Sequence, residues 1–491
     1  MKIRYIIAVI ALALMGFIPE AKAQVERPKL VVGLVIDQMR WDYLYYYDSQ
    51  YGEGGIRRLL SEGFSCENNM INYVPTVTAI GHTSVYTGTT PALHGIANNN
   101  FFIDGKKVYC CTDTTVRSVG SNTKNGMMSP HRMLATTIGD ELRIATDFRS
   151  KVIGVSLKDR AAILPAGHSA NGAYWWDSDA RCFVSSTHYM DALPQWAEKY
   201  NKSIKSYKGN PWSEPSGVTL VMDMALAALE GEQLGKHDDT DMLAISISTT
   251  DAMGHQYSTR SPEMTAVYTQ LDKDVKRLLD ALDKTVGKGN YLLFLTADHA
   301  AAHNYNFMKE HKIPAGGFDG KIGELRDYLA SLHPGCGNLV LGEDAYEIYL
   351  NHEAIAAAGL KLCDVKREAT EWLYKDKRIH FVVDMPNAAT ATIPAPIREQ
   401  IVNGWNPERS GDLLMLLRPQ YFGAEDSKTY KGTTHGSWNP YDAHIPLIFM
   451  GWHVKSGSTN TVTHITDIAP TVCAMLHIQM PDACIGKPII F

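Results

Sequence analysis

The sequence predicts an α/β protein with a mostly parallel central sheet flanked by helices and a smaller α/β cap inserted late in the chain. Apolar, β-branched runs of strand length occur at Lys29–Ile36, Lys151–Leu157 and Asp241–Ser248. Such continuous runs are typical of parallel strands that are buried on both faces. Helical patterns at 217–230 and 262–282 alternate with these runs. Alternating strands and helices are characteristic of α/β folds.

The same periodicities assign the remaining elements. We expect helices at 54–62, 79–86 and 135–145, a strand at 290–295, an apolar run at 445–450 and a last helix that opens at 466–471. Gly63 and Gly88 are suited to end the first two helices. Residues 166–215 predict a hairpin with loops, and the scattered signals in 101–129 assign no element.

The pattern changes between Gly323 and Phe422, where short strands alternate with helices. The strands are expected at 345–350, 379–383 and 413–417, with helices at 355–358 and 363–375. We therefore expect an inserted cap subdomain over 323–422, which divides a catalytic core into 24–322 and 423–491. A chain of 491 residues is long enough for this arrangement.

Residues 1–23 have the layout of a cleaved signal peptide. Lys2 and Arg4 precede an apolar run at 5–18, and Ala21 and Ala23 have the A-x-A spacing of a cleavage site. An uncleaved anchor helix is the alternative, but the run is short for spanning a bilayer. We expect cleavage near Ala23 and a periplasmic protein without a membrane segment. The eight Cys then predict disulfides or buried thiols.

The overall charge limits the partners of the chain. The formal net charge is −6 at pH 7. Proteins that bind nucleic acid or anionic membranes usually have the opposite sign, so we expect neither partner. An anionic small-molecule substrate would need a local positive site. We expect the protein to be a monomer.

The stretch Val74–Thr83 contains a candidate nucleophile. Pro75 and the β-branched residues after it favour extended backbone up to Thr78, and a short helix can follow. The Thr78 hydroxyl then lies at a helix N-terminus, where backbone N–H groups and the helix dipole favour an anion. A hydroxyl in this place can attack phosphate if its proton is removed. The alternative is that Thr78 is only an N-cap.

Two further segments offer groups that bind an anion. Lys158 and Arg160 follow the predicted strand 151–157, and both can point at one anion if the backbone stays extended. An exposed charged turn is the alternative. One of the amides in Asn98–Asn100 can donate to a phosphate oxygen, although such a run alone is typical of a turn.

Potential metal ligands follow predicted strands or lie in loops. They are Asp37, Asp251, His255, Asp298, His299 and His435. Three Asp and three His divide into two sites of three protein ligands, and neither site needs Cys, which suits zinc in an oxidising compartment. Two metal ions about 4 Å apart form the usual clamp for displacement at phosphorus. For Asp37, capping of the next segment is the alternative.

Because of these residues, the chain resembles the alkaline phosphatase superfamily. The matching motifs, in the family's order, are the strand ending in Asp37, Pro-Thr-Val-Thr78, Asp251-x-x-Gly-His255, Thr-Ala-Asp298-His299 and Thr-His435-Gly. The resemblance implies a three-layer sandwich and two Zn²⁺ ions, with Mn²⁺ as the main rival. It assigns one zinc to Asp251, His255 and His435. It assigns the other to Asp37, Asp298 and His299, next to Thr78.

Branches of this superfamily differ in their substrates. Sulfatases carry a Cys- or Ser-x-Pro-x-Arg motif, which residues 78–82 lack. Nucleotide pyrophosphatase/phosphodiesterases share the Thr nucleophile and a following Asn. Lys158-x-Arg160 is similar instead to threonine-nucleophile phosphomonoesterases of the phosphate-irrepressible type, where the Asn best matches Asn99. The two positive charges of Lys158 and Arg160 also favour a monoester substrate. A monoester dianion has one more exposed negative charge than a diester, and the two cations can offset that charge.

The resemblance implies hydrolysis of phosphate monoesters through a phosphothreonine at Thr78. The two metal ions would activate the hydroxyl and stabilise the leaving group, while Lys158, Arg160 and Asn99 stabilise the equatorial oxygens. A phosphodiesterase or nucleotide pyrophosphatase is the alternative enzyme, and a non-catalytic protein that binds phosphate or metal is the alternative class. Three further histidines are expected to be structural, namely His82, His94 and His168.

Overall fold

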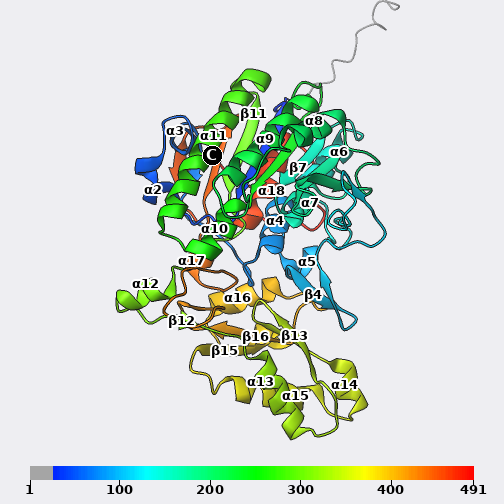
Figure 1. The fold of residues 1–491 in the computed structure, drawn as a ribbon, viewed down its shortest axis with the longest axis vertical. Helices are drawn as coiled ribbons and strands as arrows, with labels where there is room; N and C mark the ends of the chain where they lie inside the picture. Colours follow the sequence, from blue (N-terminus) through cyan, green and yellow to red (C-terminus); the bar gives the residue numbers. More distant parts are fainter. Residues whose placement is uncertain (1–25) are drawn as a thin grey trace, which may run out of the picture.

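The computed structural model describes residues 26–491, and its largest element is a ten-stranded sheet (Figure 1). The strands lie in the order β19 (Gly457–Thr459), β2 (Phe64–Cys66), β18 (Leu447–Gly451), β11 (Tyr291–Thr296), β1 (Leu30–Ile36), β10 (Asp241–Ile247), β7 (Val152–Ser156), β8 (Gly172–Asp177), β9 (Cys182–Ser186) and β6 (Ser118–Val119). The predicted signal peptide lies outside the described residues.

The central strands β11, β1, β10 and β7 run parallel. β1 pairs with β10 along its whole length, from Leu30 opposite Asp241 to Ile36 opposite Ile247. Every residue of β1 and β10 is buried, as expected for strands covered on both faces. The pairs β11–β18, β18–β2 and β8–β9 are antiparallel. The sheet is therefore mostly parallel, which confirms the predicted fold class.

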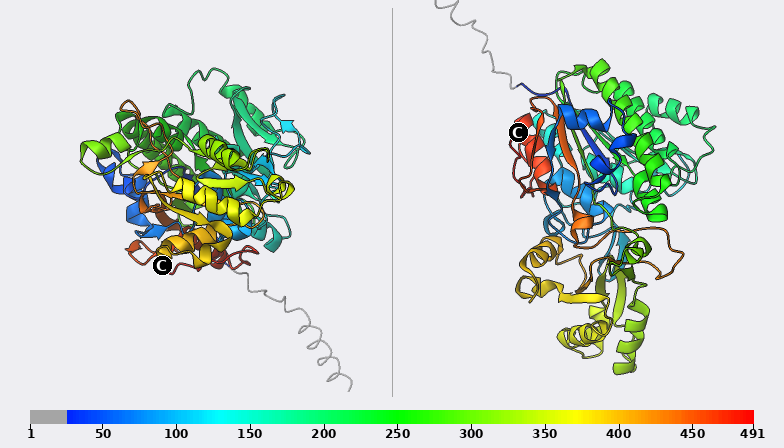
Figure 2. Two further views of the ribbon diagram at one scale, coloured as in Figure 1. Left: turned by 90° about the horizontal axis from the view of Figure 1, so that it is seen from below. Right: turned by 90° about the vertical axis from the view of Figure 1, so that its left-hand side faces the viewer.

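Two layers of helices cover the sheet (Figure 2). One layer packs around α11 (Pro262–Leu282) and contains α3 (Ile56–Glu62), α8 (Gln195–Ser203), α9 (Ser216–Gly231) and α10 (Thr249–Tyr257). The other packs around α4 (Thr78–Thr87) and contains α6 (Ile138–Ala145), α7 (Asp159–Ala166) and α18 (Ile468–Leu476). Shorter helices are α2 (Tyr43–Tyr46), α5 (Pro91–His94), α12 (Tyr305–Glu310) and α17 (Pro440–Ala443). The arrangement is the three-layer sandwich that the resemblance implied.

A second, four-stranded sheet lies at one end of the molecule, in the yellow and orange part of Figure 1. Its strands are β13 (Val340–Asp344), β14 (Glu347–Leu350), β16 (Leu413–Leu417) and β15 (Ile379–Asp384), all antiparallel. The accompanying helices are α13 (Ile322–Leu332), α14 (His352–Ala357), α15 (Leu362–Leu373) and α16 (Ala395–Gly404). These elements share a hydrophobic cluster of their own. We call them the cap; its predicted bounds, 323–422, stay a prediction.

A hairpin of β4 (Asn100–Ile103) and β5 (Lys106–Tyr109) extends from the core towards the cap. It lies in the region to which the sequence assigned no element. Two short pairs complete the strands: β3 (Asn69–Met70) with β20 (Thr463–His464), and β12 (Gly316–Gly317) with β17 (Tyr421–Phe422).

All eight Cys lie within the described residues and are free thiols. The structure therefore has thiols rather than disulfides, but only four of them are buried as expected, namely Cys66, Cys110, Cys111 and Cys473. Within residues 26–491, no helix combines the length and apolar character that crossing a membrane requires.

Candidate active site

The carboxyl ends of the four central strands bring together side chains that are far apart in the sequence. Asp37 directly follows β1, and Asp298, Asp251 and Lys158 follow β11, β10 and β7 within a few residues. Because these strands are parallel neighbours, their carboxyl ends meet at one edge of the sheet, where ligands bind in open α/β sheets. The predicted carboxylates therefore converge on one site.

The six predicted metal ligands lie in two groups of three. The atoms that Asp37, Asp298 and His299 offer lie within 4.8 Å of one another, and so do those of Asp251, His255 and His435. The first group is fully buried. The second is more open, because the His255 side chain is 39% exposed and that of His435 9%. The division is the one that the resemblance implied.

Hydrogen bonds orient the three histidine rings of these groups. Nδ1 of each ring donates to a backbone carbonyl: His255 to Thr433 at 2.9 Å, His299 to Ala300 at 3.0 Å and His435 to Thr76 at 2.7 Å. A carbonyl can only accept, so a proton is on Nδ1, and in the neutral ring the lone pair is on Nε2. Second partners of this kind are typical of metal-binding histidines.

The charges of the site fit bound cations. Burial and the neighbouring carboxylates of Asp251 and Asp298 raise the pKa of Asp37. Oδ1 of Asp37 is buried and accepts no hydrogen bond from any described residue, and Oδ2 of Asp298 is buried with Nδ1 of His82 near it, at 3.2 Å. Burial lowers the pKa of His299, which favours the neutral ring that metals bind. Buried carboxylates without compensation are costly, so this set of oxygen and nitrogen donors suits divalent metal ions.

Thr78 is the first residue of α4, and Val77 precedes it in extended backbone as the N-cap residue. Its Oγ1 lies 3.3 Å from Nζ of Lys158 and 3.4 Å from Nε2 of His299. Val77 and not Thr78 is the N-cap residue, and no side chain caps α4, so the structure does not use the Thr78 hydroxyl as a cap. Gly81 permits this position: a Cβ there would lie 2.1 Å from the backbone oxygen of Asp298, so a side chain would push α4 away.

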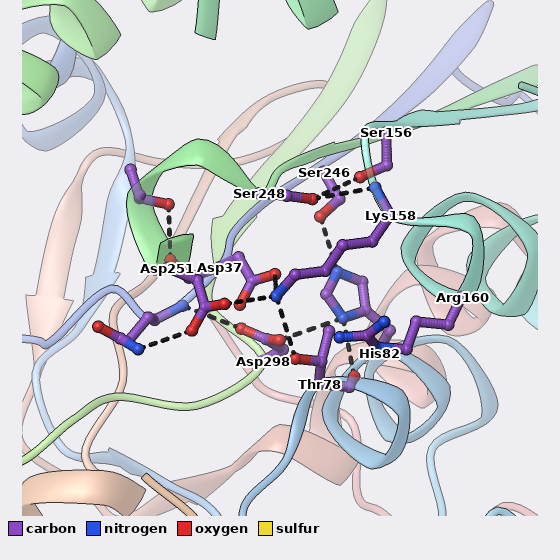
Figure 3. Close-up of polar contacts among 12 residues, drawn as sticks. Asp37, Thr78, His82, Ser156, Lys158, Arg160, Ser246, Ser248, Asp251 and Asp298 are labelled. Carbon is purple, nitrogen blue, oxygen red and sulfur yellow. Dashed lines mark hydrogen bonds and ion pairs between the residues drawn. The ribbon is translucent and has the colours of Figure 1, made fainter. Parts of the chain in front are cut away.

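Lys158 connects both groups of carboxylates to the hydroxyl (Figure 3). Its Nζ lies 2.6 Å from Oδ2 of Asp37 and 2.6 Å from Oδ2 of Asp251. The backbone does not stay extended after Lys158, because α7 begins at Asp159. Arg160 nevertheless reaches the same region from the first turn of α7, and both cations line one cavity of about 400 Å³.

Asn99 lies beside the first turn of α4. Its Oδ1 accepts a hydrogen bond from the backbone N–H of Ala79 at 3.0 Å, and its own N–H donates to Oδ1 of Asn98 at 2.7 Å. With Oδ1 occupied, the Asn99 side chain has its NH₂ group left as a donor next to Thr78. The predicted donation from one of the three asparagines to a phosphate oxygen stays a prediction.

Two residues of the site were not predicted. Gln38 links the two groups, since its Nε2 donates to Oδ1 of Asp251 at 2.6 Å and its backbone N–H donates to Oδ1 of Asp298 at 3.2 Å. A Cβ on Gly254 would lie 1.9 Å from Oε1 of Gln38, which gives the glycine of Asp251-x-x-Gly-His255 a steric reason. The place of Gln38 directly after Asp37 was the available signal.

His82 is the second of these residues, since no role at the site was predicted for it. Its Nδ1 lies 2.9 Å from the carbonyl oxygen of Thr78 and 3.2 Å from Oδ2 of Asp298, and its Nε2 lies 2.8 Å from Oγ of Ser246. His82 is buried one helical turn after Thr78. It has structural partners, as expected, but it also contacts a candidate ligand. His94 and His168 bond to Ser84 and Ala135, away from both groups.

Comparison with known proteins identifies similar chains. Residues 31–438 match the family "type I phosphodiesterase / nucleotide pyrophosphatase". The chain is 45% identical to a protein of Myroides odoratus named calcium-transporting ATPase, over 96% of this chain and 95% of that protein. It is 42% identical to alkaline phosphatase PafA of Elizabethkingia meningoseptica, over 95% of this chain and 94% of the relative.

Solved structures agree with the sequence matches. The crystal structure of wild-type alkaline phosphatase PafA matches at a TM-score of 0.90 and 42% identity, covering 95% of this chain and 99% of that chain. A second PafA structure carries replacements at a Thr and an Asn 21 positions apart and at a Lys and an Arg two positions apart. Thr78 and Asn99, and Lys158 and Arg160, have the same types and spacings. The chain belongs to the type I phosphodiesterase / nucleotide pyrophosphatase family.

Proposed function

We propose that this chain is an alkaline phosphatase that hydrolyses phosphate monoesters through a covalent phosphothreonine at Thr78. The observation that carries the proposal is the position of Lys158, which contacts the Thr78 hydroxyl between two groups of candidate metal ligands. Relatives that cover most of the chain are named alkaline phosphatases, which supports the monoester as substrate. Export to the periplasm, cleavage near Ala23 and a monomeric state are part of this proposal.

Two Zn²⁺ ions would be held by the two groups of three ligands, because both groups consist of carboxylate and imidazole donors without Cys. When bound, the ions supply positive charge that lowers the pKa of the Thr78 hydroxyl, stabilises the leaving oxygen and lowers the pKa of the attacking water. The Nδ1 hydrogen bonds of His255, His299 and His435 already orient the three rings, so the side chains would need little rearrangement to bind metal through Nε2.

The residues of the chain then perform two displacements. Oγ1 of Thr78 loses its proton and bonds to phosphorus while the bond to the leaving alcohol oxygen breaks, and the alcohol leaves with a proton. Water next attacks the phosphothreonine, which restores the hydroxyl and releases inorganic phosphate. Lys158, Arg160 and the NH₂ group of Asn99 bind the non-bridging oxygens, where negative charge must be balanced.

The charge at the nucleophile favours a monoester over a diester. A diester has one charge fewer on its non-bridging oxygens and needs room for a second ester group. Nζ of Lys158 already lies 3.3 Å from Oγ1 of Thr78, so it would lie close to the oxygens of a phosphoryl group bonded there. Arg160 lines a cavity together with Lys158. A bulky neutral group would have to displace these cations.

Hydrolysis of ATP is a second candidate, because one relative is named an ATPase. The terminal phosphoryl group of ATP carries charge similar to that of a monoester, so the same residues would bind it. The experiment compares kcat/KM for p-nitrophenyl phosphate, bis(p-nitrophenyl) phosphate and ATP, before and after chelation and after zinc is restored. We expect the monoester to exceed the diester, with activity lost on chelation and regained with zinc. A higher value for the diester would contradict the proposal, and a higher value for ATP would favour the second candidate.

A further inference from the structure

Tyr109, the last residue of β5, lies between two charged residues at the start of α7. Its hydroxyl donates a hydrogen bond to Oδ1 of Asp159, and its oxygen accepts one from Nη1 of Arg160 at 3.0 Å. Because a carboxylate can only accept, Asp159 fixes the direction of the phenol proton. The lone pair of the phenol oxygen is thereby directed at Arg160.

This contact leaves other donors of Arg160 available to an anion. Nε of Arg160 is buried and has no hydrogen-bond partner among residues 26–491. The guanidinium group is planar with its donors in a rigid fork, so an anchor at Nη1 restricts the direction of the remaining donors. Arg160 and Lys158 line the same cavity, and Nζ of Lys158 lies 3.3 Å from Oγ1 of Thr78.

Tyr109 is itself held by the β4–β5 hairpin. At the base of the hairpin, the N–H of Cys110 donates to the carbonyl of Asn99 at 3.0 Å. Further out, Nζ of Lys107 lies 3.0 Å from Oδ2 of Asp344 in the cap. The base of one hairpin therefore joins Tyr109 to Asn99, so two of the groups proposed to bind phosphate depend on its position.

We propose that Tyr109 is a positioning residue that holds the Arg160 guanidinium for the phosphoryl group. This inference rests on the proposed function, in which Arg160 binds a non-bridging oxygen. Tyr109 acts through Arg160, so its contribution should be specific to substrates that carry the extra charge of a monoester. It should also vanish when the guanidinium group is removed.

The test is Tyr109→Phe, which removes one oxygen and keeps the ring. We expect kcat/KM for p-nitrophenyl phosphate to fall about tenfold, because a hydrogen bond to a charged group is lost. For bis(p-nitrophenyl) phosphate the change should be less than about twofold. In an Arg160→Ala background, Tyr109→Phe should change the monoester value less than about twofold. Tyr200→Phe is the control, since it removes a hydroxyl that donates to the Leu220 carbonyl at 2.8 Å.

Three outcomes overturn the inference: an unchanged monoester value in Tyr109→Phe, equal losses for monoester and diester, or the same loss with and without Arg160. If Tyr109→Phe does not fold, Asp159→Asn tests the same contact, and we expect a monoester loss that disappears in the Arg160→Ala background. Failure of wild-type protein to hydrolyse p-nitrophenyl phosphate, or of Arg160→Ala to lower the rate, would instead refute the proposed function.

Discussion

Nζ of Lys158 lies 3.3 Å from Oγ1 of Thr78, so the candidate nucleophile has a cation in direct contact. The same ammonium group pairs with carboxylates from both candidate metal groups. The Lys158 side chain is 8% exposed, and charges interact more strongly where water is excluded. Replacing residues of this network should therefore have large and distinguishable effects on turnover and on metal content.

Replacement of Thr78 by Ala should remove nearly all turnover, because no hydroxyl remains to attack phosphorus. Both metal ions should stay bound, since the six candidate ligands are unchanged. Thr78→Ser keeps a hydroxyl and should retain measurable activity. Turnover of p-nitrophenyl phosphate and metal content are measured for both variants. A wild-type rate in Thr78→Ala would refute the role of the hydroxyl.

Replacement of both Lys158 and Arg160 by Ala should lower monoester kcat/KM by about a hundredfold or more, because each hydrogen bond from a charged group is worth about 1.5–3 kcal/mol. The diester value should fall much less, or rise. Arg149 and Lys151 form a matched control pair, since they lie before β7 and pair with Asp239 and Glu232. If the ratio of monoester to diester kcat/KM is the same in the Lys158/Arg160 double variant as in wild type, both cations lie outside the phosphate site.

The metal content should be about two zinc ions per chain, by the count of ligand groups. His255→Asn should lower it to about one, because it removes one ligand from the more open group. His168→Asn is the matched control, since His168 bonds to the carbonyl of Ala135 at 3.2 Å and belongs to neither group. Elemental analysis measures the zinc content of wild type, His255→Asn and His168→Asn. One metal ion or none in active wild-type protein would contradict the two-site arrangement.

Glu347 in the cap should make stability depend on pH. It is fully buried, burial raises its pKa to about 7, and its Oε1 accepts no hydrogen bond among the described residues. The folded protein therefore holds a proton that the unfolded chain releases at lower pH. Its contribution is present at acid pH and is lost as the pH rises to about 7.

Glu347→Gln should therefore raise the thermal midpoint at pH 8 and change it little at pH 5. The gain in the free energy of unfolding at pH 8 is at most about 3 kcal/mol. Oε1 of the glutamine can still accept from Tyr349 and Gly411, which now donate to Oε2 of Glu347. Glu353→Gln, at an exposed position of α14, is the control. Equal midpoints for wild type and Glu347→Gln at both pH values would show that the ionised carboxylate of Glu347 does not destabilise the fold.

Much of the core could be predicted from local patterns. The helix predicted at 262–282 has those bounds in α11, and the buried strands were recognised from their apolar runs. Asp37 and Asp298 could be placed because each follows such a strand. The order of the strands depends on pairing between distant segments, which local periodicity does not contain.

Other features depend on tertiary contacts. The turn from β7 into α7 at Asp159 could not be predicted, because the pattern indicated only that Lys158 and Arg160 could face one anion if the backbone stayed extended. α8 and α16 were missed because 195–203 is polar and prolines interrupt the start of 395–404. Gln38 could not be assigned, since its contacts to Asp251 and Asp298 join residues more than two hundred positions apart.

The central claim is that Thr78 becomes phosphorylated during turnover. Wild-type protein is mixed with p-nitrophenyl phosphate, quenched in acid within one turnover and digested, and the peptides are analysed by mass spectrometry. The account predicts one phosphoryl group on the peptide that contains Thr78, located on its side chain, and no modified peptide from Thr78→Ala. A phosphoryl group on another residue, or rapid turnover without any phosphorylated peptide, would contradict it.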